Sequence, residues 1–349
     1  MNTQIENVNK VIVSNNPLYK FFSTNDDFWK NCPVELIKTP WRGGFSNNSL
    51  TFKVDENENQ IEILKRIFGI DDQIFDCKYK KVVRGNGHEK NKIMTLHSSS
   101  LISLLCFYKV NKQQPLEIEI CTENKKRDFH FSDVSFEFKN ALSDAYRRGN
   151  NHTKTNSKSN IDIVLSEGKF NESKNVLFLE SKFSEYLHNG AVYDISQEAY
   201  STIYEELGLI PNGEFKIAVV ETYDNKEGKQ CYKMKNRGDK RTESYLEGVK
   251  QMISHFMGAC TYASKHPNTQ IYLGSIVYRF EDEIDNGKYY KYESIYKEIM
   301  QALQKLLKKH DICCNVHLID NLLTYNKVFS GINNNLLADK VAQFYHLEK

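Results

Sequence analysis

The chain has 349 residues, of which 40% are hydrophobic and 26% charged, and its formal net charge is +2. This composition is typical of a soluble globular protein, and its small net charge means that a polyanion would have to be met by local basic patches. No apolar run approaches the ~18 residues of a membrane span. The first residues lack a basic stretch followed by a long apolar core, so we expect neither a membrane span nor a secretion signal.

The eight cysteines are scattered along the chain. None forms a CxxC pair, and no spacing of cysteine and histidine suggests a zinc site. Free thiols are typical of the reducing cytoplasm, so we expect a cytoplasmic protein.

The first part of the chain predicts helices followed by strands. Residues 1–90 read as mixed helix and loop, with an amphipathic segment at 61–70. In "HSSSLISLLCFYKV" (97–110) serines precede a run of leucines, which predicts a capped and buried helix. Segments 115–120 and 134–139 alternate apolar and polar residues, as half-buried strands do.

A β-hairpin is predicted in the middle of the chain. The segment "RRGNNHTKTNSKSN" (147–160) has no apolar residue and reads as a loop. Two apolar runs follow, at 161–166 and 175–182, on either side of a polar turn near Asn171. Such runs around a turn are typical of two antiparallel strands.

After the hairpin, helices and strands alternate. Helices are predicted at 194–207, 242–266 and 293–310, and strands at 215–223, 271–280 and 314–320. This alternation predicts an α/β fold, in which helices flank a central mixed β-sheet on both faces.

The predicted hairpin brings three charged residues together. With the turn centred near residue 171, facing residues have numbers that add up to 342, so Asp162 lies opposite Glu180. Lys182 is two residues further along the same strand and points to the same face. Unpaired charges are costly to bury in a run as apolar as "VLFLESKF", so these charges are expected to have a ligand. The alternative is a solvated ion pair, against which the surrounding apolar residues and the facing Asp162 argue.

These three residue types suit metal-assisted hydrolysis. Two carboxylates held this close repel each other unless a cation lies between them. Their hard oxygen ligands suit Mg²⁺, with Mn²⁺ as an alternative. A neighbouring lysine can orient or activate the attacking water and stabilise negative charge on phosphorus. Asp162 and Glu180 as metal ligands, with Lys182 beside them, therefore favour phosphodiester hydrolysis.

The motif resembles that of the PD-(D/E)XK nuclease superfamily. "NIDIVL" and "FLESK" match its aspartate and its acid-x-lysine on adjoining strands, with Ile161 in place of the proline. "LHSSSLISLLCFY" and "FEFKNAL" further resemble a restriction-endonuclease-like subgroup of bacterial proteins, and the likeness covers roughly residues 95–280. The resemblance implies a restriction-endonuclease-like core and a metal-dependent nuclease that acts on DNA.

The resemblance also implies an additional acid upstream of the hairpin. Glu137 would take that role as a further metal ligand, with Glu119 and Glu123 as rivals. The segment of Glu137-x-Lys139 is not itself the core motif. Its aspartate, Asp133, is only four residues before Glu137 and leaves no room for a strand, a turn and a second strand.

A polar residue on a helix after the motif strand is also common in the superfamily. In the helix predicted at 242–266, Gln251 corresponds to it, with His255 one turn later, and Gln197 in the preceding helix is the runner-up. An ordinary polar surface is the alternative for Gln251. His97 and the serines after it could line the site, although helix capping explains the serines better.

Three predicted loops are basic, at 78–92, 147–158 and 226–241. Lysine and arginine in flexible loops contact phosphates without reading sequence. The second loop leads into the hairpin and the third precedes the helix of Gln251, so both are expected near the site.

The sequence therefore predicts three regions. They are an N-terminal extension at 1–94, a nuclease-like core at 95–285, and a C-terminal α/β extension at 286–349 packed on the core. The expected function is that of a Mg²⁺-dependent, endonuclease-like phosphodiesterase acting on DNA in restriction, defence or repair. A catalytically silent nucleic-acid-binding or regulatory protein on the same fold and an RNA-directed nuclease stay as alternatives. A homodimer stays open as the assembly.

Overall fold

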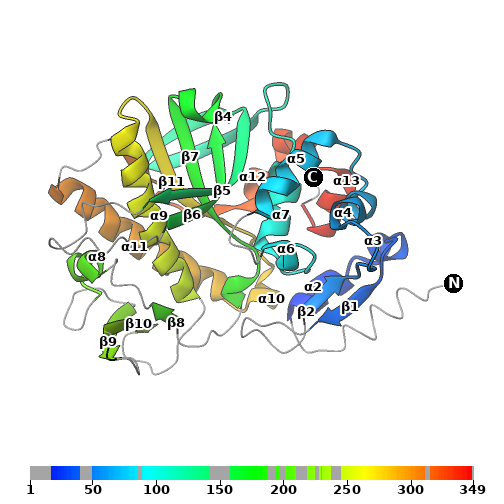
Figure 1. Ribbon diagram of the computed structural model, residues 1–349, viewed down its shortest axis with the longest axis horizontal. Helices are drawn as coiled ribbons and strands as arrows, with labels where there is room; N and C mark the ends of the chain where they lie inside the picture. The colour runs from blue at the N-terminus through cyan, green and yellow to red at the C-terminus, as the bar shows by residue number, and fades with distance from the viewer. Residues whose placement is uncertain are drawn as a thin grey trace.

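The structure is a computed structural model that describes residues 17–39, 49–84, 89–141, 158–187, 193–195, 201–209, 218–224, 228, 230–236, 245–310 and 315–347. Its central sheet has six strands (Figure 1). The strands lie in the order β12 (Val316–Leu318), β11 (Gln270–Val277), β7 (Asn175–Lys182), β6 (Lys158–Ser166) and β5 (Asp133–Ala141), and β13 (Leu323–Thr324) also pairs with β11. β5, β6 and β7 are antiparallel, whereas β7, β11 and β12 are parallel. The predicted α/β class with a mixed central sheet is confirmed.

β6 and β7 form the predicted hairpin, with a turn of 3₁₀ helix at Phe170–Glu172 between them. The paired residues run from Ile163 with Leu179 to Ser166 with Val176, and the numbers of each pair add up to 342. The predicted register is therefore confirmed. It is strongly specified because a slip of one residue would turn every buried side chain of the strand to the other face.

β6 begins at Lys158 rather than at residue 161. Ser159 and Asn160 are polar, so their composition predicted a loop, but they pair with Asn140 and Lys139 of β5. Pairing within the sheet satisfies their main-chain groups and overrides their weak strand propensity. The rest of the predicted loop, at 147–157, lies outside the described residues.

Helices cover both faces of the central sheet. α9 (Tyr245–Lys265) packs on β5, β6 and β11, and α11 (Lys288–His310) packs on α9. α7 (Ser99–Phe107) packs on β7, and α5 (Gln73–Val82) packs on β5. Neighbouring residues of a strand point to opposite faces, and Glu180 contacts α9 whereas Ser181 contacts α7. α7 and α9 therefore lie on opposite faces of the sheet (Figure 1).

The predicted helices at 97–110, 242–266 and 293–310 correspond to α7, α9 and α11. Oγ of Ser98 accepts a hydrogen bond of 3.1 Å from the main-chain N–H of Leu101, so this serine caps α7 as expected. α11 begins at Lys288 rather than at residue 293, after the short helix α10 (Asp282–Asp285).

Several strands lie outside the central sheet. β3 (Leu116–Thr122) and β4 (Lys125–Phe131) form a two-stranded sheet, and β8 (Tyr193–Ile195), β9 (Ala218–Asp224) and β10 (Gln230–Asn236) form a three-stranded one. The predicted helix at 194–207 is wrong at its start, where β8 lies, and the helix described within it is α8 (Ser201–Glu206).

Two predicted basic loops are partly regular structure. The loop predicted at 226–241 contains β10, and the loop at 78–92 contains the end of α5 and all of α6 (Glu89–Lys92). Both predictions were wrong at these residues because charge density was taken as a sign of loop. In α5, the buried Phe75, Tyr79 and Val82 form an apolar stripe at helical spacing, which a reading of charge alone overlooks.

The N- and C-terminal elements pack together beside the end of β7. The N-terminal ones are α2 (Pro17–Ser23), α3 (Asp26–Lys30), β1 (Leu36–Thr39), β2 (Ser49–Phe52) and α4 (Gln60–Phe68), and the C-terminal ones are α12 (Tyr325–Val328), a 3₁₀ helix at Gly331–Leu336, and α13 (Asp339–Phe344). The ring of Phe344 lies 4.8 Å from that of Phe28 and 5.1 Å from that of Phe22. Phe22 in turn contacts Phe183, the residue after β7, at 6.1 Å. None of the helices in the described part of the chain combines the length and apolar character needed to cross a membrane.

Candidate functional site

The candidate site lies where β7 ends. Glu180 and Lys182 occupy the last positions of this strand and are buried, with 1% and 6% of their surface exposed. Lys182 Nζ donates a hydrogen bond of 2.6 Å to Oε1 of Glu180. The two charges of "VLFLESKF" are therefore a buried ion pair and not a solvated one.

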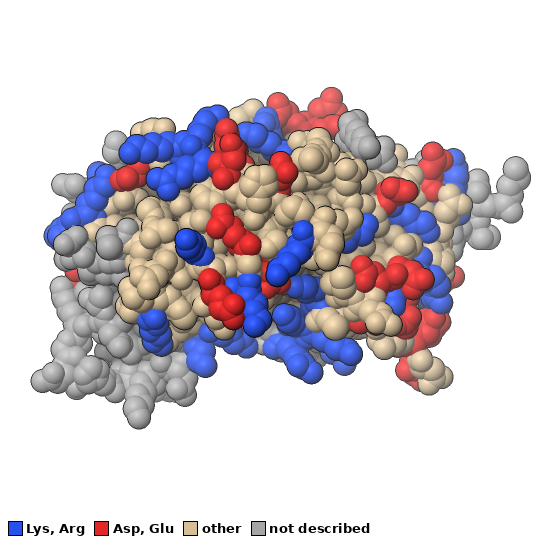
Figure 2. All heavy atoms as spheres, turned by 90° about the horizontal axis from the view of Figure 1, so that it is seen from above, with Lys and Arg blue, Asp and Glu red and all other residues tan. Residues whose placement is uncertain are grey.

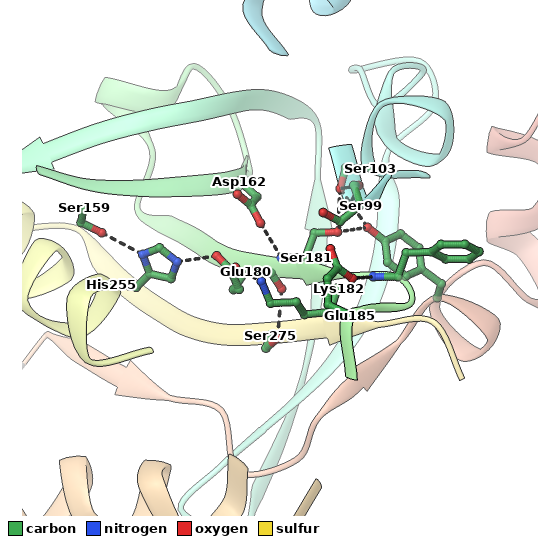
Figure 3. Close-up of polar contacts among 12 residues, drawn as sticks. Ser99, Ser103, Ser159, Asp162, Glu180, Ser181, Lys182, Glu185, His255 and Ser275 are labelled. Atoms are coloured by element: carbon green, nitrogen blue, oxygen red, sulfur yellow. Dashed lines mark hydrogen bonds and ion pairs between the residues drawn. The ribbon is translucent and has the colours of Figure 1, made fainter. Parts of the chain in front are cut away.

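Glu180 has a second partner on the opposite side, from helix α9. Nε2 of His255 lies 2.5 Å from Oε2 of Glu180, and Nδ1 of His255 lies 2.8 Å from Oγ of Ser159 on β6 (Figure 3). Both carboxylate oxygens of Glu180 are thus engaged. Glu180 is also fixed through its main chain, because Ser275 of β11 donates a hydrogen bond of 3.1 Å to its carbonyl oxygen.

The charges around Glu180 determine its ionisation. Burial acts to raise the pKa of its carboxyl group, but the neighbouring Lys182 and His255 outweigh burial and lower the pKa to about 2. Glu180 is therefore a carboxylate at neutral pH and accepts hydrogen bonds only. It follows that Nε2 of His255 carries the proton in their contact.

Asp162 lies near Glu180, but the effect on its pKa is opposite. Its Oδ2 accepts a hydrogen bond of 2.8 Å from the main-chain N–H of Ser181. Burial raises the pKa of the Asp162 carboxyl group well above its ordinary value, and the neighbouring Glu180 and Glu137 raise it further, against the lowering effect of Lys182. A cation bound beside Asp162 would offset the repulsion from Glu180 and Glu137.

Glu137 faces Asp162 across β5 and β6. The pairs on either side of it, Phe136 with Ile163 and Phe138 with Ile161, place it directly opposite Asp162. Its φ angle of 54° lies in the left-handed region, which a non-glycine residue adopts at a cost of ~1–3 kcal/mol. Its Oε2 accepts a hydrogen bond from Nδ2 of Asn160.

The three acids fit a divalent cation in part. No group of three or more histidine, cysteine, aspartate or glutamate residues in the described part of the chain is arranged as a metal site. Asp162 and Glu137 are both half-buried, and Glu180 and Glu137 add to the effect of burial in raising the pKa of Asp162. Glu180 is different, because Lys182 and His255 already occupy its two oxygens. The chemistry of Asp162 and Glu137 therefore fits a hard cation, and Glu180 would join them only by exchanging a partner.

A network of buried hydroxyl groups supports the site from the other face of the sheet. Oγ of Ser181 lies 2.7 Å from Oγ of Ser103 on α7 and 2.7 Å from the hydroxyl oxygen of Tyr325, and these last two groups are 3.0 Å apart. Ser103 also donates a hydrogen bond of 2.7 Å to the carbonyl oxygen of Ser99. The network fixes the main chain at Ser181, whose N–H group holds Asp162 (Figure 3).

The other acids named as candidates lie elsewhere. Glu119 on β3 pairs with Lys126 at 3.0 Å, and Glu123 pairs with Lys308 at 2.8 Å, both at exposed positions. Burial raises the pKa of a further acid, Glu185, against the lowering effect of Lys182, and its Oε2 accepts the main-chain N–H of Phe183. Glu185 was not among the acids predicted for the site.

Gln251 lies one turn before His255 on α9. Its Oε1 atom is buried and has no hydrogen-bond partner among the described residues. The α9 residue that contacts Glu180 is His255. The sequence placed His255 one turn after Gln251 but assigned it no partner. Gln197 lies outside the described residues.

His255 and Ser159 were not predicted as partners of Glu180. His255 is 75 positions from Glu180 in the chain, and Ser159 lies in the polar segment that predicted a loop. A usable signal was the lone histidine on the apolar face that runs through Met252, Phe256 and Ala259, all of which are buried. A buried histidine needs polar partners.

Comparisons of the chain with protein-family models, with functionally characterised proteins and with solved structures found no match. The function is therefore inferred from the geometry and chemistry of the site.

Proposed function

We propose that the protein is a metal-dependent phosphodiesterase that cleaves DNA, with a restriction-endonuclease-like core. The observation that supports this most is the meeting of Asp162, Glu180 and Lys182 at the open end of the β6–β7 hairpin, with Glu137 facing Asp162. An ion pair kept for stability alone would need no second and third acid beside it, since additional carboxylates repel. The resemblance of these residues to the PD-(D/E)XK motif agrees with this assignment.

The residues divide the chemistry between them. Asp162 and Glu137 would hold Mg²⁺ or Mn²⁺, with Glu180 as the third acid. When bound, the cation would polarise the phosphate and lower the pKa of a water molecule. Lys182 would orient that water and stabilise the negative charge that develops on phosphorus. Glu180 keeps Lys182 in place through its 2.6 Å contact.

Local lysines would provide the contacts to the phosphate backbone. Lys139 of β5 and Lys158 of β6 are exposed, and they lie on the two strands that carry Glu137 and Asp162. On the face seen in Figure 2, lysine and arginine side chains are intermingled with acidic ones. With this distribution and a net charge of +2, DNA would be held by individual lysine and arginine side chains that contact its phosphates, and not by the charge of the whole molecule.

A second candidate function is that of a nucleic-acid-binding or regulatory protein that has the fold but no activity. The observation that favours it is the engagement of both oxygens of Glu180, which leaves this acid without an open position for a metal. Metal binding separates the two candidates. A catalytic site must bind the cation through Asp162, whereas a silent one need not.

The test is incubation of the purified full chain with supercoiled plasmid, linear double-stranded DNA, single-stranded DNA and RNA. Mg²⁺, Mn²⁺ and EDTA are compared, with Asp162→Asn and Lys182→Met as matched variants. Metal-dependent cleavage of DNA that both variants lose supports the proposal. Cleavage of RNA alone would change the substrate, and binding without cleavage under every condition would favour the silent protein.

A further inference from the structure

Four polar side chains form a continuous buried line through the candidate site. Ser159 contacts His255 at 2.8 Å, His255 contacts Glu180 at 2.5 Å, and Glu180 contacts Lys182 at 2.6 Å. All four residues are buried: Ser159 has 0% of its surface exposed, His255 3%, Glu180 1% and Lys182 6%. The line crosses from β6 through α9 to β7, so it links three separate elements (Figure 3).

The contacts leave Glu180 little freedom. A carboxylate that is held through one oxygen can still rotate, but Glu180 is held through both, by groups on opposite sides. Ser159 fixes the His255 ring in turn, because its hydroxyl group engages the ring nitrogen that does not face Glu180. The position of Lys182 therefore depends on His255, which it does not contact in this line.

The packing of α9 on β6 sets this arrangement. A Cβ atom at Gly258 would lie 2.7 Å from Cβ of Ser159, so glycine is needed for the helix to come this close to the strand. Nδ2 of Asn140 donates a hydrogen bond of 2.7 Å to the carbonyl oxygen of Gly258 and fixes the helix there. Gly258 is three residues after His255, so both lie on the face of α9 that meets β6.

We infer that His255 is the positioning residue of the site, which sets the Glu180 carboxylate so that its other oxygen holds Lys182 for the reaction. The inference rests on the proposed nuclease function. It assigns to His255 no contact with substrate or metal. A buried histidine needs polar partners, but a histidine present only for packing would not need a carboxylate partner that at the same time holds Lys182.

The test compares His255→Leu, which fills similar space without a donor, with His255→Gln, whose side-chain amide can still donate to Glu180. His266→Leu is the control for loss of a histidine, because His266 lies near the end of the same helix, stacked on Tyr262 and outside the line. The cleavage of DNA with Mg²⁺ is measured for the unchanged chain and for each variant. NMR of ¹⁵N-labelled histidine records the protonation of the two ring nitrogens of His255.

We expect His255→Leu to lower kcat by about 10- to 100-fold with KM within about twofold, because misplacement of a catalytic group acts on the transition state. His255→Gln should restore kcat to within about threefold of the unchanged protein, and His266→Leu should leave kcat unchanged. In the spectrum, the ring N–H signal of His255 should be shifted far downfield by its short hydrogen bond and should lose that shift in Glu180→Ala.

Each other result overturns the inference. A ring signal that is the same in Glu180→Ala excludes the contact. Unchanged kcat in His255→Leu excludes the positioning role and leaves the nuclease function standing. If kcat of His255→Gln is as low as that of His255→Leu, the hydrogen bond to Glu180 is not the reason for the loss. Absence of cleavage by the unchanged protein on every substrate overturns the proposed function, and the positioning role with it.

Discussion

The main-chain N–H of Ser181 donates its hydrogen bond to the side chain of Asp162 and not to a main-chain carbonyl of β6. The last residues paired between β6 and β7 are Ile163 and Leu179, so the ladder ends one position before Asp162 and Glu180 would pair. The carboxylate of Asp162 thus accepts the hydrogen bond from β7 at the point where the pairing of β6 and β7 ends. This hydrogen bond stabilises the charged form of Asp162, which burial and the neighbouring Glu180 and Glu137 disfavour. The balance between these effects is the basis of the first prediction.

Asp162→Asn should stabilise the protein in the absence of metal. Burial and the neighbouring Glu180 and Glu137 raise the pKa of Asp162 well above its ordinary value, so the folded state holds this proton more tightly than the unfolded state. The folded protein therefore loses stability as pH rises from the ordinary pKa of aspartate through the raised one. Asparagine removes this loss, which is on the order of 1.4 kcal/mol per unit by which the pKa is raised.

The measurement is thermal unfolding of Asp162→Asn and the unchanged protein in EDTA at pH 4 and at pH 8. The midpoint of the variant should be higher at pH 8, and the difference should shrink at pH 4. A variant that is less stable at pH 8 would mean that the hydrogen bond from Ser181 outweighs the repulsion between the carboxylates.

Addition of Mg²⁺ or Mn²⁺ should make the unchanged protein more stable than Asp162→Asn. A cation that binds the folded state stabilises it in proportion to the logarithm of its concentration, about 2.7 kcal/mol at 100 times Kd. The midpoint of the unchanged protein should rise with metal concentration, whereas that of Asp162→Asn should not. Glu119→Gln is the matched control, because Glu119 pairs with Lys126 on β3 and should keep the response. An equal response in Asp162→Asn would exclude Asp162 as a metal ligand.

The sequence was sufficient for the part of the site that lies within one hairpin. Two apolar runs around a polar turn fix a register, and the register places Asp162 opposite Glu180 without any knowledge of the rest of the fold. The same reasoning placed the serines at the start of α7, because a helix cap is a local feature.

The part of the site that depends on packing between distant elements was not predictable in the same way. The rotation and distance of α9 relative to β6 decide whether Gln251 or His255 meets Glu180, and these depend on contacts such as that of Gly258 with Ser159. No period in the sequence encodes them. The left-handed conformation of Glu137 is likewise imposed by its surroundings, since glutamate does not favour it.

Lys182→Met should destabilise the protein strongly, because it leaves the buried carboxylate of Glu180 with one partner fewer. Removing one member of a buried ion pair costs about 3–5 kcal/mol. The double variant Lys182→Met/Glu180→Gln should be considerably more stable than Lys182→Met, since it removes the uncompensated charge. Urea unfolding of the two single variants and the double variant gives the coupling between these residues. Additive effects would contradict the 2.6 Å contact.

Gly258→Ala should destabilise the protein and reduce any activity without removing a side chain of the site. The added Cβ would lie 2.7 Å from Cβ of Ser159, so helix α9 has to move away from β6. Overpacking of this kind typically costs about 1–3 kcal/mol. Moving the helix also withdraws His255 from Ser159 and Glu180.

The same position offers a test of cause by compensation. In a Ser159→Gly background the clash is absent, so Gly258→Ala should cost much less there than in the unchanged protein. The free energy of unfolding is measured by urea for Ser159→Gly, Gly258→Ala and the two together, which separates the clash from the loss of the Ser159 hydroxyl group. If Gly258→Ala costs the same in both backgrounds, the approach of α9 to β6 is not what glycine provides, and the placement of His255 must depend on other contacts of the helix.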